Sequence, residues 1–418
     1  MRNGIVAQSF GCLGLLAFRN GLLLLYLAAL GVDPSGILTY LSLGNIVSAA
    51  LMIPFAFLSD RYGKKRVGVG GQFFAIAGFG MISLSAFASR EAASLVILAG
   101  IVSFWVGSTM MMSGWFALLS PIVPADERGR FFGRLRISWN LVGVVFAAGA
   151  TAALTDDSPP EAFQILFALI AVALFVRLLF YRTLPELEPP RPASAPVVKT
   201  ILAILRTNNY ASFVAYVFLL TLFTTGVLGL FGLVEKKVLL WGDDEVVWMA
   251  NLTIVGSLAG FGLSGRAVDR YGTKVVFLAC HFGFALVMLA FLGRAFVSAS
   301  VLPFALGVIH FALGMAMAAS SISISTEILA LIPPEDKSLS TAVCTTLQRA
   351  GQGLSGLICA WMLRLGILNP TWTLFGREMT SYDTLVLLFA CMIVVLVVAL
   401  GLVPSVLRKA EWLPRGTQ

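Results

Sequence analysis

Apolar residues are grouped along the chain in twelve long runs, separated by short breaks that contain charged residues, proline or glycine. Most runs last about twenty residues, the length that an α-helix needs to cross about 30 Å of hydrocarbon. A membrane-spanning strand would instead show alternation over about ten residues. We therefore expect an all-α membrane protein with twelve transmembrane helices, over 5–30, 36–58, 67–89, 94–120, 131–154, 161–182, 210–234, 246–267, 274–293, 300–331, 339–366 and 383–407.

One polar interruption is longer than the others and lies between the sixth and seventh runs. Its first part is rich in proline, which favours an extended linker, and 197–206 could form a short helix on the membrane surface. Six predicted spans precede it and six follow it. We therefore expect an N-terminal six-helix bundle over 1–183, a cytoplasmic linker over 184–209 and a C-terminal six-helix bundle over 210–418.

The composition agrees with this pattern. Of the 418 residues, 58% are apolar and 12% are charged, and the mean hydropathy is +0.91. Soluble proteins have about 25% charged residues, so this chain lacks the polar side chains that would cover a water-facing surface. The five cysteines all lie inside apolar runs, which predicts buried thiols rather than disulfides or metal ligands. We expect no metal and no cofactor.

The basic residues are distributed asymmetrically. With the N-terminus inside, the inner segments hold 20 Lys and Arg and the outer segments hold 6. Positive charge prefers the cytoplasmic side, so both termini are expected there, in a plasma (inner) membrane. The net charge of +8 is then explained by topology and by attraction to anionic lipid headgroups, and a nucleic-acid partner is not expected.

A four-residue motif occurs twice, at equivalent places in the two halves. Asp60-Arg61-Tyr62-Gly63 follows the second span and Asp269-Arg270-Tyr271-Gly272 follows the eighth. The two copies are 209 residues apart, half the chain length. This spacing indicates an internal repeat of two pseudo-symmetric halves.

These loops resemble the signature of the major facilitator superfamily, which has the form G-x-x-x-D-R-x-G-R/K-R/K. The second copy keeps the leading glycine, Gly265, whereas the first has Ala56 there. The resemblance implies the family's fold and a secondary transporter. The usual marks of its drug–proton antiporters are absent, because Ser103 stands where they carry an arginine and 139–154 has no proline.

The resemblance also implies a gate. Asp60 would latch the start of span eleven and Asp269 the start of span five, because free N–H groups and the helix dipole favour negative charge at a helix N-terminus. A loop that only sets the topology is the alternative. The gating candidates are Asp60, Arg61, Gly63, Lys64, Asp269, Arg270 and Gly272.

Ionisable residues inside spans are costly and point to function. Arg19 lies near the middle of span one, and the N-terminal half offers it no carboxylate inside a span. It therefore needs an acid from the other half, backbone carbonyls or an anionic substrate. Span eleven carries a polar stripe of Thr345, Gln348, Gln352 and Ser355, with Arg349 beside it. The substrate-binding candidates are Arg19, Asn20, Asn45, Trp139, Asn140, Gln348, Arg349 and Gln352.

Proton coupling has two candidates, both in span ten. Glu327 is the one clear carboxylate that the sequence places inside a span, and His310 carries a side chain that exchanges protons near neutral pH. Structural roles in pairing or hydrogen bonding are the alternatives. Arg177, near the predicted cytoplasmic end of span six, is expected to extend toward the interface.

The predicted function is transport of a small organic, anionic or amphipathic solute by alternating access, with protons as a possible second partner. The alternatives are an exporter of lipophilic compounds, using apolar walls such as Met110-Met111-Met112, and a receptor that has kept the fold without transport. We expect a monomer in the lipid bilayer and no enzymatic activity.

Overall fold

The computed structural model describes residues 2–19, 21–119, 121–123, 128–155, 158–187, 201–202, 205–206, 209–331 and 337–401. Side-chain contacts are described for most of these. In the first half, the helices are α1 (Arg2–Leu16), α2 (Leu22–Ala29), α3 (Pro34–Tyr62), α4 (Lys64–Leu84), η1 (Ser85–Phe87), α5 (Arg90–Leu119), α6 (Arg128–Ala153) and α7 (Pro160–Arg182).

The second half repeats this order and adds a hairpin. Its elements are α9 (Tyr210–Thr224), α10 (Gly226–Lys237), α11 (Asp243–Tyr271), α12 (Thr273–Leu292), η3 (Gly293–Phe296), α13 (Leu302–Leu331), α14 (Lys337–Arg364), β1 (Thr371–Leu374), β2 (Arg377–Thr380), α15 (Ser381–Leu396) and η5 (Val397–Gly401). The two strands pair antiparallel, with Thr371 opposite Thr380. Most of the predicted linker, including 188–200, lies outside the described residues.

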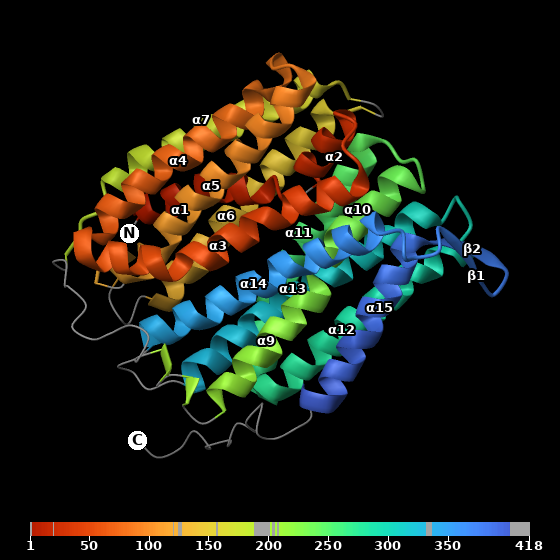
Figure 1. Ribbon diagram of the computed structural model, residues 1–418. Coiled ribbons are helices and arrows are strands. Elements are labelled where there is room, and N and C mark those ends of the chain that lie inside the picture. Colours follow the sequence, from red (N-terminus) through yellow and green to blue (C-terminus); the bar gives the residue numbers. More distant parts are fainter. Residues whose placement is uncertain are drawn as a thin grey trace.

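The helices form two bundles that lie side by side (Figure 1). The bundles meet along two helix pairs, α3 with α14 and α6 with α11. Within the bundles the closest packing joins α4 with α5 in the first and α11 with α13 in the second. Small residues allow the close approach: a Cβ on Gly107 would lie 2.2 Å from the carbonyl oxygen of Gly71. Such small-residue contacts are typical of helices packed within lipid.

Ten helical stretches in the described part of the chain are long and apolar enough to cross a membrane. The α1–α2 pair is interrupted, with 15 and 8 residues in its two parts, and α14 carries the polar stripe. These two segments complete the twelve crossings of an all-α membrane protein.

The first helix of each half is broken, which the sequence analysis did not predict. The run over 5–30, expected as one helix, divides into α1 and α2 around 17–21, where Gly21 has a φ of +83°. The seventh run divides at Thr225 into α9 and α10. Ser355 of α14 gives one backbone group at this break a partner, because its Oγ accepts a hydrogen bond of 2.8 Å from the Gly226 amide. A break inside lipid needs such polar partners.

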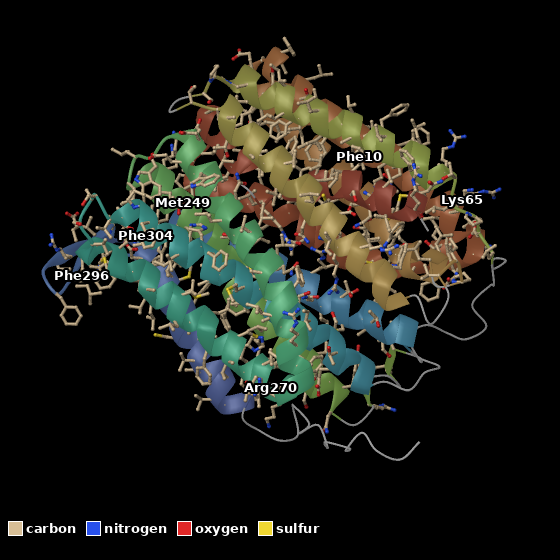
Figure 2. The ribbon with its side chains drawn as sticks, turned by 180° about the vertical axis from the view of Figure 1, so that it is seen from behind. Phe10, Lys65, Met249, Arg270, Phe296 and Phe304 are labelled. Atoms are coloured by element: carbon tan, nitrogen blue, oxygen red, sulfur yellow. The ribbon has the colours of Figure 1, made fainter. Side chains whose placement is uncertain are left out.

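The two ends of the molecule are named here by their features. The motif end carries Gly63 and Gly272, whose φ angles of +103° and +84° allow the chain to turn directly from one span into the next. The hairpin end carries β1 and β2. In Figure 2 the basic residues Lys65 and Arg270 lie at the motif end, far from Phe296 and the hairpin.

Candidate substrate site

Arg349 of α14 lies where the two bundles meet. Its Nη1 donates hydrogen bonds to Asn45 Oδ1 on α3 at 3.1 Å and to Gln352 Oε1 on its own helix at 3.2 Å. Its guanidinium group lies over the ring of Trp105 on α5, 5.6 Å from the ring centroid. Asn45 and Trp105 belong to the N-terminal bundle, so this part of the polar stripe on α14 faces the opposite bundle.

Arg19 approaches the same region from the first bundle. It lies at the break between α1 and α2, and its side chain is exposed although it is halfway along a membrane span. Its positive charge interacts unfavourably with that of Arg349. Like charges interact appreciably only when they are close or poorly screened. Each half therefore contributes one arginine whose charge opposes that of the other.

Trp105 forms an aromatic surface beneath Arg349. It is buried and packs against Phe18 and Phe104, with ring centroids 5.5 and 5.7 Å apart. Gly44 leaves room for the indole, because a Cβ there would lie 1.8 Å from Nε1. Among the residues that the structure describes, this Nε1 has no hydrogen-bond partner.

These groups have a definite chemical capacity. A guanidinium group can bind a carboxylate through two parallel hydrogen bonds, and amide side chains such as those of Asn45 and Gln352 can hold it in orientation. An indole face contributes apolar contact and can stack on an aromatic ring. The arrangement suits a small anion with an apolar or aromatic part.

Of three other predicted site residues, Asn140 bonds within its own bundle through its side chain, and Trp139 and Gln348 through their backbone carbonyls. Trp139 is partly buried, and its carbonyl accepts a hydrogen bond from Cys12 Sγ. The Asn140 amide donates to the carbonyl of Arg136 on the same helix at 2.8 Å, and the Gln348 carbonyl accepts from Thr221 Oγ1 at 3.2 Å. Asn20 lies outside the described residues.

Arg136 of α6 is a cross-bundle cation that was not among the predicted site residues. Its guanidinium group lies over the ring of Phe261 on α11, 5.2 Å from the centroid. Nearer the hairpin end, the same two helices are joined by Asn251, whose amide donates to Thr151 Oγ1 at 3.0 Å. Asn251 therefore acts as a link between the bundles.

The prediction that Glu327 is the one clear carboxylate inside a span was wrong. Glu327 is buried in α13, but α10 extends to Lys237 and so brings Glu235 into the seventh span. Glu235 Oε1 lies 2.7 Å from Nε2 of His310. The sequence analysis ended this span at 234, directly before Glu235 and two lysines, and so excluded the glutamate.

Arg177 also differs from the expectation. Its side chain does not reach the interface but is 3% exposed, and its Nη2 donates to Gln8 Oε1 at 3.4 Å and to Met111 Sδ at 3.2 Å. Gly11 makes this possible, since a Cβ there would lie 2.4 Å from Arg177 Nε. The burial follows from packing of α7 against the glycine-bearing face of α1.

At the motif end, a carboxylate caps a helix, but its source is unexpected. Glu186, just after α7, accepts hydrogen bonds from the backbone amides of Lys64 at 2.6 Å and Lys65 at 3.4 Å, at the N-terminus of α4. The side chain of Asp60 is exposed. The side chains of Asp269 and of 337–339 lie outside the described set, so the latch stays a prediction.

Two adjoining hollows of about 400 and 530 Å³ open beside the α3–α14 pair near the hairpin end. Both are lined by Ser35, Thr39 and Arg364. They lie near the N-terminus of α3, whereas Arg349 is four helical turns further along α14 from Arg364. They are therefore separate from the Arg19–Arg349 region.

Comparison with known proteins gives the family. The family model described as Major Facilitator Superfamily matches residues 6–356. A gallate transporter of Pseudomonas putida is 28% identical over 149 residues, which cover 35% of this chain and only 32% of that protein.

Solved structures agree over nearly the whole chain. A POT family transporter in complex with a thioalcohol-conjugated peptide has a TM-score of 0.75 at 13% identity, over 97% of this chain and 96% of that one. A D-xylose–proton symporter has a TM-score of 0.67 at 16% identity, over 94% of each chain. At these identities the likeness concerns the fold. With a family model matching most of its length and two six-helix bundles, the chain belongs to the Major Facilitator Superfamily of membrane transporters, which are not enzymes.

Proposed function

We propose that this transporter moves a small organic anion by alternating access, and that the anion binds between Arg19 and Arg349. The observation that carries the proposal is the position of Arg349, which bonds to Asn45 of the opposite bundle and lies over the ring of Trp105, with the charge of Arg19 near enough to repel it. Two positive charges in a region of low polarity repel each other, and an anion placed between them removes that cost. Binding would then draw the two bundles together, as alternating access requires.

The gallate transporter supports this substrate class, because gallate is an organic anion. The surface formed by Trp105 beneath Arg349 would suit the ring of an aromatic carboxylate. The alternative of a lipophilic exporter has less support, since Met111 is buried in the first bundle and accepts a hydrogen bond from Arg177.

In the proposed orientation the protein lies in the plasma (inner) membrane, with the motif end and both termini on the cytoplasmic side. The excess of Lys and Arg in the segments at that end supports it. The contacts described above between the bundles lie toward the hairpin end or near the middle, as with Asn251–Thr151 and Arg349–Asn45. They suit a conformation that is closed to the outside.

Proton coupling through Glu327 and His310 remains part of the proposal. Both side chains are buried in α13, and a buried acid or histidine that exchanges a proton changes the charge inside the bundle. Glu327→Gln tests the first candidate by the loss of uptake driven by a proton gradient in proteoliposomes.

The substrate proposal is tested by binding of carboxylates to the purified protein, with gallate and benzoate as probes and xylose as a neutral solute. Arg349→Lys keeps the charge but removes the planar fork, so we expect carboxylate affinity to fall about 10- to 100-fold. Arg364→Lys, an exposed arginine on the same helix, is the control and should bind normally. Equal affinity in both variants would contradict the proposal, as would the absence of any carboxylate binding in favour of neutral solutes.

A further inference from the structure

A buried polar cluster joins three helices of the second bundle near the hairpin end. His310 of α13 lies at its centre, with Nε2 2.7 Å from Glu235 Oε1 of α10 and Nδ1 3.0 Å from Thr253 Oγ1 of α11. Glu235 is 1% exposed, His310 2% and Thr253 7%. The ring of Phe231 packs against His310 edge-on, with centroids 5.7 Å apart. The cluster is thus enclosed by protein.

Several of the nearby charged groups have other partners. Lys236 and Asp243 pair at 2.7 Å, and Arg294 of η3 pairs with Asp383 of α15 at 2.6 Å. Glu245 of α11 accepts a hydrogen bond from the backbone amide of Gly242. Further charged side chains at this end are Lys237 on α10, Asp244 on α11, Arg364 on α14 and Asp33 before α3. The described pairs leave the charge of Glu235 to be balanced by His310.

The hydrogen bonds of the cluster suit two protonation states. With a neutral imidazole protonated at Nε2, Nδ1 accepts from the Thr253 hydroxyl, and the cluster carries one negative charge. With one more proton, both ring nitrogens donate, Thr253 accepts, and the cluster is neutral. The neutral state is far better suited to a buried site, because an uncompensated charge is strongly disfavoured there.

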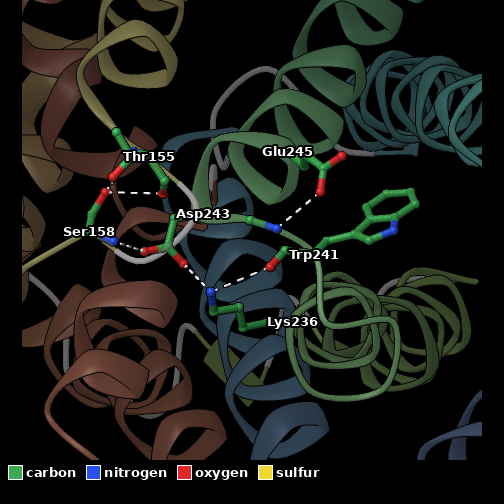
Figure 3. A network of polar contacts seen from close by, with 7 residues as sticks. Thr155, Ser158, Lys236, Trp241, Asp243 and Glu245 are labelled. Atoms are coloured by element: carbon green, nitrogen blue, oxygen red, sulfur yellow. Dashed lines mark hydrogen bonds and ion pairs between the residues drawn. The ribbon is translucent and has the colours of Figure 1, made fainter.

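The residue after Glu235 connects this cluster to the contact between the bundles. Lys236 Nζ pairs with Asp243 Oδ1, and Asp243 Oδ2 accepts a hydrogen bond of 3.2 Å from the Ser158 amide of the first bundle (Figure 3). The Ser158 hydroxyl accepts a hydrogen bond from the Thr155 amide and donates one to the Thr155 carbonyl. A movement of α10 at Glu235 would therefore disturb the closed hairpin end.

The short helix α10 is well placed to move. It begins at the break after α9, and it contacts the first bundle, where Cβ atoms on Gly229 and Gly232 would lie 2.8 and 3.1 Å from Leu38 and Leu24. Discontinuous helices of this kind commonly form the substrate and ion sites of transporters. Its contacts thus connect the polar cluster with both bundles.

We propose that the Glu235–His310–Thr253 cluster is a proton-binding site that controls the hairpin-end gate: the proton stabilises the closed conformation, and its loss favours opening. The inference rests on the proposed function for the orientation of the chain. In this orientation the cluster takes up a proton from the outside, and the hairpin end then closes. Unlike the anion site, the cluster should act without substrate.

The test uses the full-length protein in nanodiscs, without substrate, with spin labels on Phe87→Cys and Leu240→Cys. These positions lie in different bundles at the hairpin end, and both side chains are 80% exposed. Cys391, the exposed native cysteine among the five, is replaced by serine. Pulsed electron spin resonance between pH 5 and 9 should show a closed distance at acid pH and an additional longer distance at alkaline pH.

Two variants have opposite expected results. Glu235→Gln removes the negative charge and should remain closed across the pH range, whereas His310→Gln leaves it unbalanced and should remain open. Thr253→Val, a milder change, should move the midpoint by up to about one pH unit, as expected for one lost hydrogen bond to a titrating group. It serves as the test where the other variants do not fold.

His281 provides a matched control. It is buried in the same bundle and bonded at both ring nitrogens, to Tyr216 and Ser320, but no carboxylate is among these partners. His281→Gln should keep the pH response. The proposal is overturned if the wild-type distances do not change with pH, if Glu235→Gln, His310→Gln and Thr253→Val respond normally, or if His281→Gln loses the response too. A normal gate response in a protein that binds no carboxylate would contradict only the proposed substrate.

Discussion

Asn45 of α3 accepts a hydrogen bond of 3.1 Å from Arg349 of α14, so a neutral amide of one half orients the cation of the other. Asn45 is only partly buried, and its carbonyl oxygen is the cross-bundle acceptor for this guanidinium group. Because an amide leaves the charge of Arg349 intact, it can hold the side chain without competing for an anionic substrate. This distinction leads to the first prediction.

Asn45→Ala removes the orienting bond, and we expect carboxylate affinity to fall about 3- to 10-fold, the effect of one typical hydrogen bond lost. Asn45→Asp places a carboxylate beside Arg349 and should weaken anion binding further while it raises the unfolding temperature. A purely structural role for Asn45 would reverse this order, with aspartate tolerated better than alanine. Calorimetric titration and thermal unfolding of both variants distinguish the two roles.

The second prediction concerns the support of Trp105. A Cβ at Gly44 would overlap the indole at 1.8 Å, so Gly44→Ala must displace either Trp105 or α3. We expect a loss of about 1–3 kcal/mol of stability, typical of overpacking, together with weaker binding of aromatic carboxylates. Gly80→Ala is the control, because its Cβ would meet no atom within 4 Å and alanine favours a helix. If Gly44→Ala behaves like Gly80→Ala, Trp105 is not held as described.

The third prediction concerns the buried ion pair at the hairpin end. Arg294 and Asp383 lie 2.6 Å apart, with side chains 5% and 0% exposed, and join η3 to the start of α15. Arg294→Met leaves Asp383 without its cation and should lower stability by about 3–5 kcal/mol. The double variant with Asp383→Leu should recover most of this loss. Thermal unfolding in detergent measures both, and equal losses in the single and double variants would contradict the role of the pair.

How much of this could be read from the sequence depends on the range of the interactions. The positions of the spans and the turns at Gly63 and Gly272 follow from local features: apolar runs and a repeated motif. Arg349 and Gln352 could also be placed on one side of α14, because helical periodicity gives that directly. Polar residues that bond within their own bundle, such as Asn140, look the same in the sequence as polar residues that reach the other bundle. The pattern alone could not distinguish the two groups.

The breaks and the buried pairs were beyond such reasoning. The break at Thr225 contains no proline and is stabilised by Ser355, 130 residues further along the chain. Glu235 is followed by two lysines and resembles the end of a span, and only its bond to His310, 75 residues away, explains its burial. Arg177 is buried because Gly11 of another helix leaves space for it. Each depends on contacts between distant segments.

The fourth prediction concerns the motif end. If Asp60 and Asp269 hold that end closed in part of the cycle, Asp→Asn at either position should increase the population open at the motif end. Transport should slow while substrate affinity stays largely unchanged. The rate of labelling of cysteines introduced beside the motifs measures the opening. Unchanged labelling in both variants would leave the motifs with a topological role only.

The last prediction concerns Arg19, which the structure places at the α1–α2 break with an exposed side chain. Its charge repels that of Arg349, and an anion bound at the proposed site would relieve this repulsion. Arg19→Lys keeps the charge and the relief but loses the two-point contact with a carboxylate. We expect anion transport to fall about 10-fold or more, with transport of neutral solutes unaffected.

In Arg19→Gln, anion transport should fall further, and the empty protein should become more stable because the repulsion disappears. Transport in proteoliposomes and thermal unfolding without substrate measure the two effects. Loss of stability in Arg19→Gln would show that the guanidinium group has a structural partner instead of a substrate, and would refute the assignment.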